Sequence, residues 1–141
     1  MDFTYDSGIY LLEIYLPNKV DINIGAKGEC FFPDGLYYYT GSAQKNLQAR
    51  VERHFSDKKN NHWHIDYFLE KAQIRSCCTW PLSGEKECEL AHFFLNKLNG
   101  KIIVSGFGAS DCNCDSHLFL MTEDFAPVYN FQAEFPNICL L

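Results

Sequence analysis

The spacing of apolar residues changes at Gly41, and this change constrains the fold more than any other feature of the sequence. Before Gly41, apolar and β-branched runs alternate with turn signals such as Pro33-Asp34-Gly35, a pattern typical of short strands. After Gly41, apolar residues recur every three to four positions with charges between them, which predicts an amphipathic helix. The apolar positions of this helix are Ala43, Leu47, Val51 and His54-Phe55.

The same patterns assign the other elements. Four strands precede the helix, at residues 9–16, Ile22 to Ile24, Phe31-Phe32 and Leu36 to Thr40, and we expect them to form one small antiparallel sheet. After the helix come a short helix at 65–69, a strand at Gln73 to Trp80, a helix from Leu90 to Leu98 capped by Asn99-Gly100, and a strand at His117 to Met121. This order predicts an α+β fold in which a small antiparallel or mixed central sheet is flanked by helices.

Length and composition suit one globular unit. The 141 residues, 47% of them hydrophobic, are expected to form a single domain, with a core over about 8–104 and a Gly- and Cys-containing tail over about 105–141. No apolar run approaches the roughly 20 residues of a membrane span, and the N-terminus lacks the pattern of a signal peptide. The seven cysteines, two of them adjacent at Cys77-Cys78, favour reduced thiols. We therefore expect a soluble cytoplasmic protein.

The distribution of charge matters more than its total. A net charge of −6 argues weakly against nucleic acid, because phosphate binding depends on Lys and Arg. However, five basic residues and two acids lie between Ser42 and His64, whereas five acids and no Lys or Arg follow Lys101. The sequence therefore predicts one basic face that would suit DNA.

Two tyrosines and a helix face form the candidate site. Tyr10 and Tyr39 lie on strands that should be neighbours, and the helix that follows carries Arg50 and His54 on one face, since residues i and i+4 share a face. Gly8 and Gly41 beside the tyrosines would let a backbone or a phosphate approach closely.

Several blocks of sequence, in order, resemble the GIY-YIG nuclease superfamily and its Uri-type endonuclease branch. Three segments resemble the nuclease core: Gly8-Ile9-Tyr10, Tyr39-Thr40-Gly41 and residues 45–51. Three further segments resemble the Uri-type branch: residues 38–43, 62–67 and 106–114. The resemblance covers residues 8 to about 120, and it implies a GIY-YIG-like fold and cleavage of DNA.

By position, the resemblance implies that Tyr10, Tyr39, Arg50 and Glu87 form the active site, with His54 where relatives carry tyrosine or histidine. Glu87 would hold Mg²⁺ or Mn²⁺, which prefer hard oxygen ligands, and Arg50 would offer its forked charge to the phosphate. Glu87 is preferred over Glu85 and Glu89 because residues 87–91 best match the family's Glu-x-x-Leu pattern. Tyr10 is the first choice for the general base or water-orienting group.

Two positions depart from the family's pattern. Thr40 replaces an isoleucine, and its β-branched side chain still suits a strand. Ser42 stands where many relatives have lysine, which removes a cation that would lower the pKa of a tyrosine. Activation of a phenol would then depend on Arg50 or on the metal ion.

Further polar residues are candidate DNA contacts: Lys45, Arg53, Lys58, Lys59, His62 and His64. A metal pair at His62 and His64 is less favoured, because residues i and i+2 do not meet on a helix and Trp63 between them needs burial. Cys112, Cys114 and His117 invite a zinc interpretation. It is also less favoured, since structural zinc sites use four ligands and cysteines spaced by two to four residues.

The sequence therefore predicts a metal-dependent DNA endonuclease that hydrolyses phosphodiester bonds with water. The alternative is a non-catalytic nucleic-acid-binding accessory module that retains the nuclease fold. We expect a protein partner or the shape of the nucleic acid to supply target choice. The preference for DNA over RNA stays open.

Overall fold

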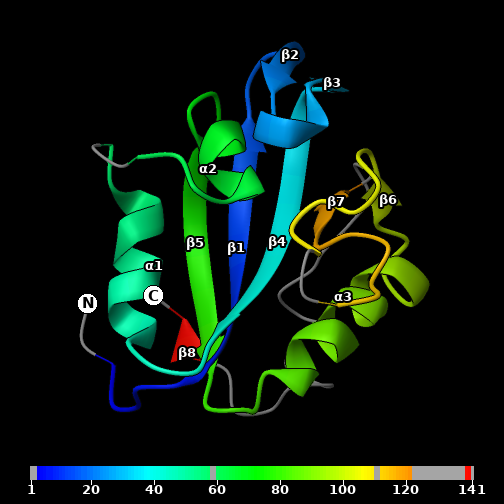
Figure 1. Cartoon of the computed structure of the whole chain (residues 1–141). Coiled ribbons are helices and arrows are strands. Elements are labelled where there is room, and N and C mark those ends of the chain that lie inside the picture. Colours follow the sequence, from blue (N-terminus) through cyan, green and yellow to red (C-terminus); the bar gives the residue numbers. More distant parts are fainter. Residues whose placement is uncertain (1–2, 58–59, 110–111, 122–138, 141) are drawn as a thin grey trace.

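Two long neighbouring strands, β1 (Gly8–Leu16) and β4 (Gly35–Ala43), form the centre of the fold (Figure 1). They pair in antiparallel register, with Gly8 opposite Ala43 and Leu16 opposite Gly35. The computed structural model of the chain describes residues 3–57, 60–109, 112–121 and 139–140.

In the part of the chain that the structure describes, six antiparallel strands form the main sheet in the order β6-β7-β4-β1-β5-β8. The added strands are β5 (Gln73–Trp80), β6 (Lys101–Ile102), β7 (Leu118–Leu120) and β8 (Cys139–Leu140). The prediction that the first four strands share one sheet is wrong. β2 (Val20–Asn23) and β3 (Glu29–Phe32) form a separate two-stranded sheet around the 3-10 turn Gly25–Lys27, because β4 and β5 already occupy both edges of β1.

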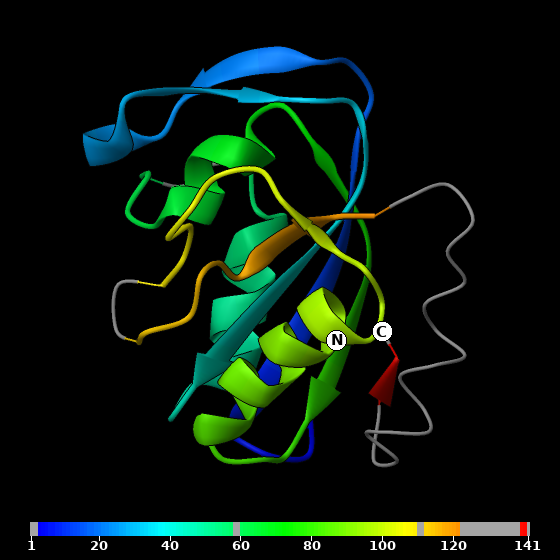
Figure 2. The ribbon, with the colours of Figure 1, turned by 90° about the vertical axis from the view of Figure 1, so that its right-hand side faces the viewer.

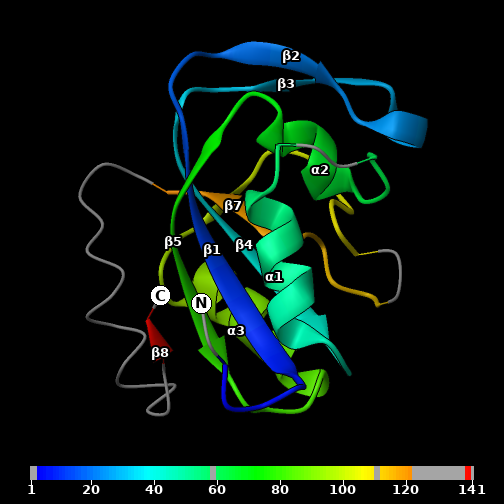
Figure 3. The same ribbon diagram turned by 90° about the vertical axis from the view of Figure 1, so that its left-hand side faces the viewer.

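Helices cover both faces of the main sheet (Figures 2 and 3). α1 (Leu47–Phe55) and α2 (His64–Leu69) lie on one face, and α3 (Glu85–Asn96) lies on the other. One apolar core therefore joins Tyr10, Leu12 and Ile14 to α1 and α2, and a second joins Ile9 and Leu11 to α3. The predicted α+β class, with a central antiparallel sheet flanked by helices, is confirmed.

The first helix begins later than its apolar spacing predicts. Ala43 ends β4, and Asn46 then adopts a left-handed φ of 56° before the helix starts at Leu47. Asp6 stabilises this start, since its side chain accepts the N–H of Asn46 and its carbonyl that of Leu47. At the other end His54 is buried, but Phe55 is 44% exposed.

The last helix, α3, ends at Asn96 instead of the predicted Leu98, and the predicted cap at Asn99-Gly100 follows it. Asn99 has a φ of 56°, and the N–H of Gly100 donates to the carbonyl of Phe94 at 2.8 Å. Among the described helices, each is too short or too polar to cross a bilayer.

Candidate active site

The edge of β4 is paired over only part of its length. β7 pairs with Tyr37 to Tyr39, and in the described part of the chain the last backbone–backbone hydrogen bond on this side joins the N–H of Thr40 to the carbonyl of His117 at 3.0 Å. Successive strand residues point to opposite faces, so Tyr39 and Gly41 face α1 while Thr40 and Ser42 face α3. Side chains from both faces of the sheet can therefore meet around Ser42.

The ring of Tyr10 occupies the space that a side chain at position 41 would need. The two residues are opposite each other in the β1–β4 register, and the phenol ring of Tyr10 lies across the glycine. A Cβ atom at position 41 would lie 2.7 Å from Cε2 of this ring, and closer still to Cζ and to the hydroxyl oxygen. The expected room beside Gly41 is thus filled by a side chain, whereas at Gly8 it is filled by the carbonyl of Trp80.

Tyr10 is fully buried and hydrogen bonded to His54. Its hydroxyl lies 2.8 Å from Nε2 of His54, which α1 presents from the next layer. Burial raises the pKa of Tyr10 well above the usual value of a phenol, and the nearby charge of Arg50 offsets only part of this effect. At neutral pH the Tyr10 phenol is therefore protonated in the resting site.

Tyr39 lies beside this pair. Its ring meets those of His54 and Phe107 edge-on, with centroid separations of 6.2 Å in both cases. Gly108, with a φ of 71°, packs against the Tyr39 ring. The contact is close, since a Cβ at position 108 would lie 3.1 Å from ring atom Cε1. Burial raises the pKa of Tyr39 as well, and a charge on Tyr10 would raise it further. Tyr39 is therefore also neutral at neutral pH.

Arg50 reaches the edge of β4 from α1. Its Nη1 donates to the carbonyl of Ser42 at 3.1 Å, and its guanidinium lies over the ring of Trp63, 4.5 Å from the centroid. Arg53 also lies over Trp63, at 4.4 Å. Trp63 thus orients both arginines, a role that the sequence did not reveal.

Glu87 reaches the same edge from α3. One carboxylate oxygen accepts a hydrogen bond from the Ser42 hydroxyl at 2.6 Å, and the other lies 3.0 Å from Nδ1 of His117. Burial lowers the pKa of His117 to about 4, so this second contact joins a carboxylate to a neutral imidazole. By contrast Glu85 is exposed, and Glu89 forms an exposed ion pair with Lys86. The structure places Glu87, of the three glutamates, in the site.

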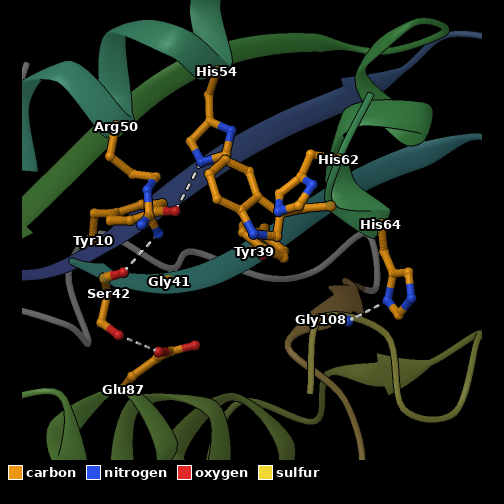
Figure 4. A pocket seen from close by; sticks show the side chains of 11 residues that line it. Tyr10, Tyr39, Gly41, Ser42, Arg50, His54, His62, His64, Glu87 and Gly108 are labelled. Atoms are coloured by element: carbon orange, nitrogen blue, oxygen red, sulfur yellow. Dashed lines mark hydrogen bonds between the residues drawn. The ribbon is translucent and has the colours of Figure 1, made fainter. Parts of the chain in front are cut away.

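These groups line one open cavity (Figure 4). Its volume is about 310 Å³, and since a water molecule occupies ~30 Å³ of liquid, the cavity has room for a phosphate group and several waters. The lining residues are Tyr10, Tyr39, Gly41, Ser42, Arg50, His54, His62, Trp63, His64, Glu87 and Gly108. Among these described residues Glu87 is the one carboxylate. A single carboxylate beside an open cavity of this size fits Mg²⁺, which usually keeps several waters.

The residues predicted to contact DNA lie in different environments. Lys45 and His62 are exposed, and His62 and His64 line the cavity. Nδ1 of His64 accepts the backbone N–H of Gly108 at 2.9 Å, and burial, helped by the charge of Lys27, lowers the pKa of His64. Lys58 and Lys59 lie outside the described residues. Contact with DNA stays a prediction for each of them.

Arg53 has a structural partner. Its guanidinium forms two hydrogen bonds with the carboxylate of Asp66, at 2.9 and 3.0 Å, and so ties α1 to α2. Asp66 is buried, and it also accepts the backbone N–H groups of His62 and Trp63. Burial on its own would raise the pKa of Asp66, but these hydrogen bonds outweigh it and lower the pKa.

Asp66→Asn should lower the free energy of unfolding by about 2 kcal/mol at pH 7, the usual cost of losing charged hydrogen bonds. Because folding lowers the pKa of Asp66, its contribution is complete above the unfolded value of about 3.9 and is lost as the pH falls through the folded pKa. Urea unfolding at pH 7 and pH 3 measures both effects. The exposed Asp21→Asn is the control, and equal losses in the two variants would contradict the assignment.

The loop before β7 contributes residues that the sequence did not assign to the site. Thr40 and Glu87 both contact Nδ1 of His117, and Nε2 of His117 lies 3.1 Å from Sγ of Cys112. This loop therefore supports the carboxylate from behind. Gly106 and Gly108 in this loop have left-handed φ values of 76° and 71°, which glycine adopts without strain.

Comparison with known proteins gives one match. A family model described as domain of unknown function DUF123 matches residues 9–139. Neither a curated protein nor a solved structure matches the chain.

Proposed function

The chain belongs to the DUF123 family, that of Uri-type GIY-YIG-like proteins, and on this premise we propose that it is a metal-dependent DNA endonuclease. One observation carries the proposal. Tyr10 from β1, Arg50 from α1 and Glu87 from α3, far apart in the chain, line one cavity that is large enough for a phosphate group. With Tyr39, which also lines the cavity, these are the four residues that the resemblance to GIY-YIG nucleases implies.

Hydrolysis of a phosphodiester requires a deprotonated water and a stabilised leaving oxygen. Since the phenol of Tyr10 is protonated at rest, it acts by orienting the attacking water and by passing its own proton to Nε2 of His54, 2.8 Å away. The pair then works as a relay, in which Tyr10 takes the proton of the water as it gives its own to His54. Tyr39 packs against the imidazole and keeps it aligned.

Arg50 and Glu87 would stabilise the negative charge that develops on the phosphate, Arg50 directly and Glu87 through the metal ion. Arg50 is held by Ser42 and Trp63, and it presents a permanent cation where the negative charge of the phosphate grows in the transition state. Glu87 would hold Mg²⁺ or Mn²⁺, which supplies Lewis-acid stabilisation of the phosphate and of the leaving oxygen. Arg50 also replaces the charge that is missing at Ser42, since it lowers the pKa of Tyr10 against the effect of burial.

Arg50→Ala should reduce cleavage by on the order of 10²-fold, the effect of removing one preorganised charge. Wild type and variant are incubated with nicked, branched and plain duplex DNA in Mg²⁺ or Mn²⁺, and single-turnover rates are measured. The matched control is Arg75→Ala, which also removes a guanidinium that lies over an aromatic ring, that of Tyr15, at 4.2 Å. Arg75 is on β5 and is not among the residues that line the cavity.

Equal cleavage by Arg50→Ala and wild type would point to a contaminating nuclease and would overturn the proposal. DNA binding without cleavage by the wild type, in either metal ion, would instead support a non-catalytic accessory module that retains the fold. The same assay with RNA substrates decides which nucleic acid is cut.

A further inference from the structure

Three thiols and an imidazole converge behind the candidate active site. Sγ of Cys88, Cys112 and Cys114 and a ring nitrogen of His117 all lie within 4.8 Å of one another. Cys88 comes from α3, and the other three come from the loop before β7. We propose that these four residues bind one structural Zn²⁺ ion.

The geometry is close to that of a bound ion. Tetrahedral zinc with bonds of about 2.0–2.3 Å has ligand-to-ligand distances of roughly 3.3–3.8 Å. The cluster, within 4.8 Å, needs shifts of about an ångström at most to reach this arrangement. Three sulfurs and one imidazole nitrogen are among the ligand sets of structural zinc, and soft thiolates favour Zn²⁺ over Mg²⁺ or Ca²⁺.

His117 is oriented as a zinc ligand should be. Its Nε2 faces the thiols, 3.1 Å from Sγ of Cys112, while its Nδ1 lies 2.6 Å from Oγ1 of Thr40 and 3.0 Å from the carboxylate of Glu87. With Nε2 on the metal, Nδ1 carries the ring proton and donates it to one of these oxygens. Metal-bound histidines usually have such an acceptor behind them, and a carboxylate is a common choice.

The zinc ion would have a structural role and would not take part in catalysis. Four protein ligands close the tetrahedron and leave no position for a substrate. Zinc would fasten the loop at residues 112–117 to α3, and through His117 it would also hold the carboxylate of Glu87 at the cavity. The magnesium site proposed at Glu87 and the zinc site are therefore separate, and they share no ligand.

The test is the metal content of the full chain. Protein purified with reductant and without chelator should contain one equivalent of zinc by mass spectrometry. Co²⁺ in place of zinc should give tetrahedral d–d bands and thiolate charge-transfer absorption. Cys114→Ser should lose the bound zinc and the charge-transfer bands. Cys30→Ser, which changes a half-buried cysteine on β3 outside the cluster, should keep both.

Glu87→Gln separates this proposal from the nuclease proposal. It keeps all four zinc ligands and, of the groups behind them, changes one of the two acceptors that face Nδ1 of His117, so zinc should stay bound with an affinity lowered by about 10- to 100-fold at most. The zinc site would be overturned by wild-type protein that contains no zinc and gives no cobalt bands. A disulfide within the cluster would overturn it as well. These readouts need no DNA and no soluble Cys114→Ser protein.

Discussion

Replacing Glu87 by glutamine is expected to reduce metal-dependent DNA cleavage by about 10³-fold or more, the largest effect on rate that we predict. Glutamine has the shape of glutamate, and it can still accept the hydrogen bond that the Ser42 hydroxyl donates at 2.6 Å. It lacks the negative charge that a hard divalent cation requires. Single-turnover cleavage over a range of Mg²⁺ concentrations measures the loss and shows whether excess metal restores activity.

Two controls accompany this variant. Glu89→Gln changes the same residue type one half-turn along α3, where the side chain is 59% exposed and pairs with Lys86, so cleavage should be unchanged. The melting temperature of Glu87→Gln should stay close to that of the wild type. If Glu89→Gln lost activity and Glu87→Gln kept it, Glu87 would be the wrong glutamate.

Replacing Gly41 by alanine is expected to cost about 3 kcal/mol of stability, at the upper end for overpacking a core, and about 10²-fold in cleavage. The added methyl group would overlap the ring of Tyr10, which is buried at 2% exposure and has little space to move. A displaced ring would also lose its 2.8 Å contact with His54. Urea unfolding and cleavage rates measure the two effects.

A nearby glycine and a double variant test the cause. Gly84→Ala is the matched control, because Gly84 has a φ of −58° and a Cβ there would meet Ser42 Oγ at 3.8 Å, an ordinary contact. In a Tyr10→Ala background the Gly41→Ala penalty should largely disappear, since the overlapping ring is gone. A penalty of the same size in both backgrounds would mean that the ring of Tyr10 is not the reason for Gly41.

Local spacing predicted most of the helices and strands one by one, but not the two-residue strands β6 and β8. The change at Gly41 marked the passage from strands to helix, and the i, i+4 spacing put Arg50 and His54 on one helix face, where both line the cavity. The strand assignment brought Tyr10 and Tyr39 to neighbouring strands. These predictions succeeded because side-chain direction within a helix or strand follows from its backbone geometry.

Contacts between elements were not predictable in this way. The separation of β2 and β3 from the main sheet depends on which strands occupy the edges of β1. The role of Trp63 between Arg50 and Arg53 depends on how α2 packs against α1. The sequence also does not predict which acid a basic residue pairs with. Arg53 is therefore a predicted DNA contact by sequence, although in the structure it pairs with buried Asp66.

The sequence by itself determined the class of the fold, the two tyrosine strands and the helix face beside them, because each rests on a periodic pattern within one element. Only the tertiary structure decided that Glu87 meets Ser42 and His117, and that Cys88 meets Cys112 and Cys114. The physical reason is that α3 packs on the far face of the sheet from α1. Side chains of α3 reach the cavity past the end of β4 that β7 does not pair with. The spacing of residues along the chain does not predict where the pairing of β4 with β7 stops.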